Sequence, residues 1–164
     1  MRTVTAVDFI KDPRGRYHSL LHRADGVTVR LEGGSYNRIG VRVPHDIAHL
    51  VVEDAYAWEW GLWGVLACGG LVQNASFVAG RRPPHSAERA HAIAKQRSAS
   101  LHGAEVLVRK VADALLAGDR RLAPSPTEAF ERARPALQDA AARWDTLPDG
   151  DALRLSWTLT SIRR

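Results

Sequence analysis

The clearest strand pattern in the chain is Leu153-Arg154-Leu155-Ser156-Trp157-Thr158-Leu159-Thr160. Apolar and polar side chains alternate along it, which is the two-residue period of a β-strand with one buried face. Residues 2–10 alternate in a similar way. Two further strands are predicted at residues 17–23 and 27–31, because they flank Asp25-Gly26, a dipeptide typical of tight hairpin turns, and Gly33-Gly34 should end this hairpin. We expect the C-terminal strand to join the sheet that the N-terminal strands form.

Helical segments are predicted between these two groups of strands. They cover residues 44–58, 65–79, 86–116 and 127–144. Pro44 suits the first position of a helix, Gly69-Gly70 should interrupt the second segment, and Gly118 should stop the third. A capping box, Ser125-Pro126-Thr127-Glu128, opens the last helix, which Pro135 should kink or split. The predicted fold class is therefore α+β: a small antiparallel sheet of N-terminal strands plus the C-terminal strand, packed on three or four helices in a single domain over residues 1–164.

Composition excludes several classes of protein. The 164 residues are 45% hydrophobic and 25% charged, which is ordinary globular composition. A single cysteine, Cys68, rules out an intramolecular disulfide and favours a reducing compartment, so we expect a cytoplasmic protein. The longest apolar run, residues 61–72, is shorter than the roughly 20 residues that a membrane helix needs. The formal net charge is +5, but the arginines are scattered and no nucleic-acid motif is present, so neither nucleic acid nor membrane is an expected partner.

The segment that indicates chemistry is Pro44-His45-Asp46-Ile47-Ala48-His49-Leu50-Val51-Val52-Glu53-Asp54. In a helix, residues four and eight positions apart stay close to one face, so His45, His49 and Glu53 form a narrow stripe. Two imidazoles and a carboxylate can bind one divalent metal ion, for which zinc is the first candidate. Asp46 would orient or deprotonate a water molecule, the role that a glutamate has at this position in zinc peptidases.

Several other residues are candidates for the same site. Tyr56 and Trp60 continue the stripe if the helix persists, and they would line a substrate pocket. Arg97 falls at the centre of an apolar stripe on the predicted helix 86–116 and would hold a substrate carboxylate or phosphate. Whether His85 or Glu105 completes the site stays open.

Each of these residues also has an interpretation without chemistry. Asp46 suits the positive end of a helix dipole, and Glu53 could pair with an arginine. Arg97 could pack its stem and extend its head into solvent. In that case the two histidines would have a structural role.

Three pieces of the chain carry a resemblance to known families. They are the motif Val-Pro-His-Asp-x-x-His-x-x-Val-Glu at residues 43–53, the Trp-Gly segment at 60–64, and Arg-Trp-x-x-Leu-Pro-x-Gly-x-x-Leu-x-Leu-x-Trp at 143–157. Together they resemble a family of small uncharacterised proteins from GC-rich bacteria, a resemblance that covers most of the chain and implies no activity. The chain is also similar to the Coq-type zinc proteins of ubiquinone biosynthesis, in which His-Asp-x-x-His is followed after eleven residues by a glutamate ligand. Here that position is Gly61, so Glu53 or Glu59 would take the place of that ligand.

The function that the sequence predicts is that of a metal-binding protein, a metal-dependent hydrolase that acts on a small molecule. The alternative is a non-catalytic accessory or partner-binding protein whose His-Asp-x-x-His helix is structural. The sequence leaves open whether the chain forms a homo-oligomer.

Overall fold

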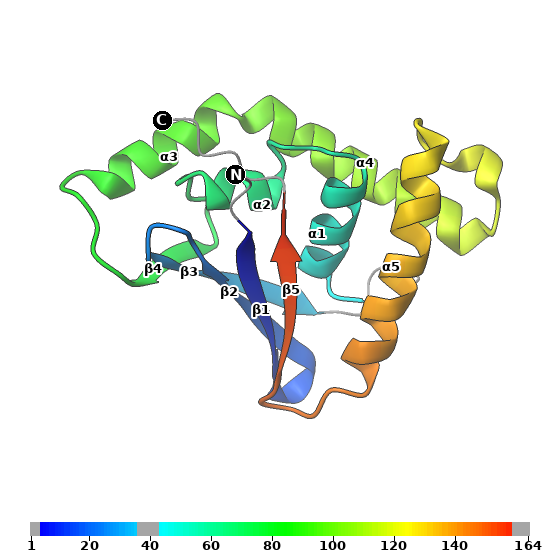
Figure 1. Cartoon of the computed structure of the whole chain (residues 1–164), viewed down its shortest axis with the longest axis horizontal. Coiled ribbons are helices and arrows are strands. Elements are labelled where there is room, and N and C mark those ends of the chain that lie inside the picture. The colour runs from blue at the N-terminus through cyan, green and yellow to red at the C-terminus, as the bar shows by residue number, and fades with distance from the viewer. Residues whose placement is uncertain (1–3, 36–42, 159–164) are drawn as a thin grey trace.

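The computed structural model describes residues 4–35 and 43–158, and its architecture is α+β (Figure 1). Five strands form one open antiparallel sheet in the order β4-β3-β2-β1-β5. The strands are β1 (Thr5–Asp12), β2 (Arg16–His22), β3 (Thr28–Ser35), β4 (Ala75–Ala79) and β5 (Ala152–Trp157). The helices are α1 (His45–Ala55), α2 (Leu62–Ala67), α3 (Ser86–Gln96), α4 (Ser98–Ala117) and α5 (Thr127–Asp145), with short 3-10 turns η1 (Pro13–Gly15) and η2 (Arg120–Leu122). No helix in these described ranges is long and apolar enough to cross a membrane.

One face of the sheet packs against helices. Alternate residues of β1 and β2 are buried, as the two-residue period requires. Phe9 of β1 meets Trp63 of α2 with ring centroids 5.5 Å apart, and Tyr17 of β2 meets Trp144 of α5 at 6.1 Å, both edge to face. The core therefore lies between this sheet face and the helices.

The C-terminal strand joins the N-terminal sheet, as the sequence predicted. β5 pairs antiparallel with β1 and forms one edge of the sheet (Figure 1). Leu153 and Trp157 are buried, and Leu155 is half-buried opposite Val7. The predicted strand residues Leu159 and Thr160 lie outside the described residues.

The predicted hairpin between β2 and β3 is also confirmed. Gly26 has a φ of +82°, and the Asp25 carboxylate accepts a hydrogen bond from the Val27 amide at 3.1 Å. The strand itself runs further than predicted, because β3 continues through Gly33 and Gly34. A Cβ at Gly33 would collide with the Tyr17 ring, so this glycine allows the close approach of β2 and β3.

The prediction of helix over residues 65–79 was wrong in its second half. Helix α2 ends at Ala67, and Gly69, with a φ of +100°, turns the chain away from it. Residues 75–79 then form β4, which pairs with β3 at the other edge of the sheet. Phe77 and Val78 favour a strand. The strand was missed because the apolar run before it shows no two-residue alternation.

The other helices differ from prediction in three respects. The first helix ends at Ala55, and Ala57 has a φ of +52°. The long helix is two helices that meet at Arg97, a break that no glycine or proline marks in the sequence. The last helix starts at Thr127 after Pro126, without a capping side-chain hydrogen bond, and Pro135 does not split it. The structure therefore has five α-helices over the described residues where three or four were expected.

Burial of Trp157 generates a stability prediction. Its side chain has no exposed surface, so Trp157→Ala should lower the free energy of unfolding by about 3 to 5 kcal/mol, as large-to-small core substitutions do. Chemical denaturation followed by circular dichroism measures this change. Leu116→Ala is the control, because Leu116 is 70% exposed and its loss should be nearly neutral. An unchanged midpoint for Trp157→Ala would contradict the assignment of β5 to the core.

Candidate metal centre

The N-terminus of α1 is held in place by two aromatic side chains from other elements. The hydroxyl of Tyr17 on β2 accepts a hydrogen bond from the Asp46 amide at 3.4 Å. The indole of Trp63 on α2 donates to the Asp46 carbonyl at 2.8 Å. The helix packs against α5 and α4 (Figure 1), so its first two turns have a fixed orientation.

Three side chains from two helices converge beside α1. His45 and His49 come from α1, and Glu105 comes from α4. The two Nε2 atoms lie 3.2 Å apart, Glu105 Oε2 is 3.2 Å from His45 Nε2, and Glu105 Oε1 is 3.2 Å from His49 Nε2. Ligand atoms around one tetrahedral zinc ion with bonds near 2.0 Å are about 3.3 Å apart. The His45-His49-Glu105 group could therefore hold a metal ion.

Two further carboxylates contact the imidazole rings at their Nδ1 atoms. Asp46 Oδ1 lies 3.2 Å from His45 Nδ1, and Glu53 Oε1 lies 2.8 Å from His49 Nδ1. A carboxylate accepts hydrogen bonds, so each Nδ1 is the donor of its pair. Carboxylates that hold the non-ligating nitrogen of a histidine are a general feature of metal sites, because they set the tautomer and the ring orientation.

With both Nδ1 atoms used as donors, the two Nε2 atoms face each other with lone pairs. Glu105 adds two more acceptor oxygens to the same space. Three groups that accept hydrogen bonds require a cation between them, either a proton or a metal ion. The pKa values agree with this requirement: hydrogen bonds with Asp46 and Glu105 raise the pKa of His45 to about 9.

The pKa values of His49 and Glu105 are shifted in the directions that agree with a cation between the three groups. Burial opposes a charge on His49, but its contacts with Glu105 and Glu53 outweigh burial, and its pKa is raised. Hydrogen bonds with His45 and His49 lower the pKa of Glu105. The cluster therefore favours positive charge at its centre.

The cluster is closed on one side and open on the other. The His49 side chain is 1% exposed, whereas those of His45 and Glu105 are 45% and 56% exposed. Solvent therefore reaches the group from the side of His45 and Glu105.

The predicted ligand set was His45-His49-Glu53, whereas the group that could hold a metal ion contains Glu105, a residue that the sequence left open, in place of Glu53. Residues 45 and 53 are about 12 Å apart along the helix axis, and Glu53 contacts Nδ1 of His49, whereas His45 and Glu105 contact its Nε2. Glu53 instead lies behind His49 and is fully buried. Its carboxylate also accepts hydrogen bonds from the amides of Leu62 at 2.8 Å and Trp63 at 3.2 Å, the first residues of α2.

Asp46 lies on the inner side of the cluster. It is buried against His45 and Tyr17, away from the open side. Asp46 contacts the His45 ring through Oδ1, and its predicted role of orienting or deprotonating a water molecule stays a prediction. Its second oxygen, Oδ2, is buried and has no hydrogen-bond partner among the described residues.

The other predicted site residues lie elsewhere. The Tyr56 hydroxyl donates to the Pro124 carbonyl at 2.8 Å and so connects the end of α1 to the loop before α5. Exposed Arg97 stacks its guanidinium 3.8 Å from the centroid of the Trp60 ring, at the junction of α3 and α4. His85 is largely exposed beside Glu88. None of these residues contacts His45, His49 or Glu105 through a hydrogen bond or ion pair in the described part of the chain, and the substrate-binding roles of Tyr56, Trp60 and Arg97 stay predictions.

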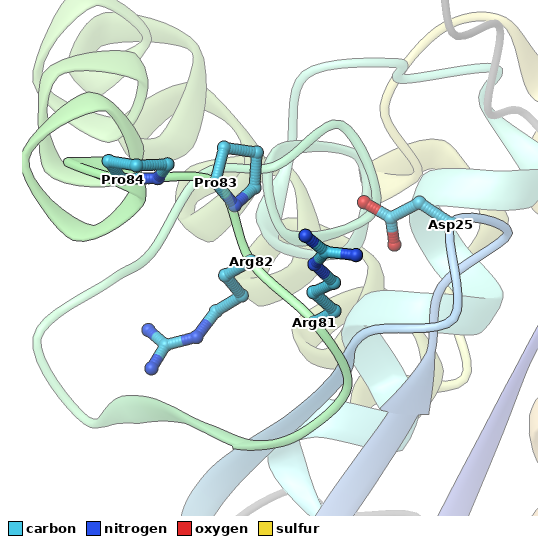
Figure 2. A pocket seen from close by; sticks show the side chains of 5 residues that line it. All are labelled: Asp25, Arg81, Arg82, Pro83 and Pro84. Atoms are coloured by element: carbon cyan, nitrogen blue, oxygen red, sulfur yellow. The ribbon is translucent and has the colours of Figure 1, made fainter.

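A surface hollow of about 550 Å³ lies apart from this cluster (Figure 2). It is lined by Asp25 of the β2–β3 turn and by residues 81–84 of the loop before α3. Arg82 places its guanidinium 4.5 Å from the centroid of the Phe77 ring. The hollow shares no lining residue with the histidine cluster.

Comparisons of the chain with protein-family models, with curated proteins and with solved structures find no match. The resemblance to the family from GC-rich bacteria and to the Coq-type zinc proteins therefore stays a prediction.

The space around Glu53 generates a prediction about Gly61. A Cβ at Gly61 would collide with the Glu53 carboxylate, which cannot move aside because three donors hold it. Gly61→Ala should therefore lower the free energy of unfolding by about 1 to 3 kcal/mol, the usual cost of overpacking. Gly34→Ala is the control, since a Cβ there meets nothing within 4 Å. Equal denaturation midpoints for the two variants would contradict the placement of Glu53.

Proposed function

We propose that the protein binds one divalent metal ion, zinc in the first place, through His45, His49 and Glu105, and is a metal-dependent hydrolase of a small molecule. The observation that carries the proposal is that the two Nε2 atoms lie 3.2 Å apart and that each lies 3.2 Å from one oxygen of the Glu105 carboxylate. Two histidines and one glutamate are the ligand set of several catalytic zinc sites, which keep a further position for water or substrate.

Zinc in such a site supplies a Lewis acid and lowers the pKa of bound water to about 7. The residues of this chain have separate tasks. His45, His49 and Glu105 hold the ion, while Asp46 and Glu53 keep both rings in the ligating tautomer. The exposed side at His45 and Glu105 admits a small substrate. The single cysteine supports a reducing compartment, and we place the protein in the cytoplasm.

The second candidate function is the non-catalytic accessory protein. The buried half of the cluster favours it, because His49 and Glu53 already satisfy each other and the start of α2 without a metal ion. The two functions differ in whether metal is bound.

The same ligand set also suits Fe(II), so the identity of the bound metal decides between hydrolytic and oxidative chemistry.

The first test of the proposed function is the metal content of the protein. Protein purified without an affinity tag and incubated with zinc should contain about one equivalent, measured by elemental analysis after dialysis. Glu105→Ala and His49→Ala should each lose it, because each removes one of three ligands. Glu105 is half-exposed, so its variant should fold normally and separates loss of metal from loss of structure.

The matched control is His102→Ala, which removes an exposed histidine from the same helix α4. This variant should keep its metal. Wild-type protein without metal after zinc incubation would end the metal proposal and favour the accessory role.

The second test of the proposed function is hydrolytic activity. The zinc-loaded protein should cleave an activated ester or phosphate ester, with 4-nitrophenyl acetate and 4-nitrophenyl phosphate as probes. Chelation should reduce the rate to that of the buffer, and added zinc should restore it. Glu105→Ala should behave as the chelated protein, whereas His102→Ala should match the wild type. Metal binding without turnover of either probe would contradict hydrolysis of these two ester classes and leave the metal site standing.

A further inference from the structure

We infer that Arg109 binds an anionic group of the substrate, so that the substrates of the proposed site are small molecules with a carboxylate or phosphate group. This inference rests on the proposed metal site and adds the chemistry of its substrate. The evidence for the inference is the position and the charge of the residues next to Glu105 on α4.

Arg109 lies one helical turn after Glu105 on α4. Residues four apart on a helix share a face, with Cβ atoms about 5 to 6 Å apart. Both side chains are on the exposed part of α4, whereas the buried residues of this helix, Ala104, Leu107, Val108, Val111 and Ala114, lie on another face. The guanidinium can therefore reach the open side of the cluster.

A glutamate followed four residues later by an arginine is an arrangement that ordinarily forms an ion pair. Here the pair is absent, because Glu105 directs one oxygen to His45 and the other to His49. Asp113, one turn further along α4, does not pair with Arg109 either. Over residues 4–35 and 43–158 the guanidinium has no ion-pair partner, and its charge is available to a ligand.

The charges at the open side then favour an anion. A divalent ion held by two neutral imidazoles and one carboxylate has a net charge of +1, and Arg109 adds a second positive charge one turn away. The carboxylates of Asp46 and Glu53 lie behind the imidazole rings, on the buried side. A carboxylate or phosphate has oxygens enough for two contacts, one with the metal ion and one with the planar guanidinium.

Anion binding to cobalt-loaded protein tests this inference. Co²⁺ in place of zinc gives a visible spectrum that changes when a ligand enters the coordination sphere. Inorganic phosphate and acetate are titrated separately into the wild type, Arg109→Met and Lys110→Met. Lys110 is the matched control, because it is an exposed cation on the same helix, one residue and about 100° away. Neutral imidazole serves as a ligand that needs no cation.

The expected result is that phosphate or acetate binds to the wild type and that Arg109→Met weakens this binding at least tenfold. Lys110→Met should stay within twofold of the wild type, and imidazole should bind equally to all three proteins. The anion that loses more affinity identifies the substrate group as phosphate or carboxylate.

The outcomes separate this inference from the proposed function. Absence of a cobalt spectrum in the wild type would remove the metal site, and the inference with it. A cobalt spectrum with equal anion affinity in the wild type and Arg109→Met, or with no anion binding, would overturn the role of Arg109 alone. An equal loss for Arg109→Met and Lys110→Met would show only the general effect of net charge and would also overturn it.

Discussion

A carboxylate with no exposed surface must find its hydrogen-bond donors inside the protein, and Glu53 finds three of them. One is the imidazole of His49 and two are the first amides of α2, so the same group orients a ligand and satisfies the start of a helix. Gly61 makes room for it, because any side chain at that position would occupy the space of the carboxylate. The Glu53 carboxylate reaches the space beside Gly61 from α1.

The sheet could be predicted from the sequence because its main determinants are local. Alternation in β1 and β5 and the Asp25-Gly26 turn between β2 and β3 each lie within about ten residues, and all were confirmed. Strand β4 was missed because its burial pattern is irregular and its pairing with β3 depends on chain segments more than forty residues apart. The break at Arg97 was missed for a related reason: a helix that ends without glycine or proline leaves no local signal.

The site could be predicted only in part, for reasons of helix geometry. Histidines four residues apart share one face, so the pair His45 and His49 was identified correctly as two members of the group. The carboxylate predicted as the third ligand was Glu53, whereas the group that could hold a metal ion contains Glu105, because the prediction considered the face of the helix and not the distance along its axis. Glu105 lies 60 positions from His45 on another helix, and its contact with the pair depends on how α1 and α4 pack. No spacing rule within one helix can supply that contact.

The packing of α1 on α4 has a consequence for stability. Helix α1 carries both histidines and both carboxylates behind them, so α4 completes the metal-binding group through Glu105 alone. Near this contact, the Trp58 indole donates to the Ser100 carbonyl at 3.1 Å and covers Gly103, where a Cβ would come within 2.7 Å of the ring. A metal ion bound by all three residues requires this packed arrangement and has no matching site in the unfolded chain. By linkage, binding would therefore stabilise the folded state in proportion to the logarithm of the metal concentration above the dissociation constant. By the same linkage, the contact between Trp58 and Gly103 would contribute to the affinity for a metal ion that neither residue touches.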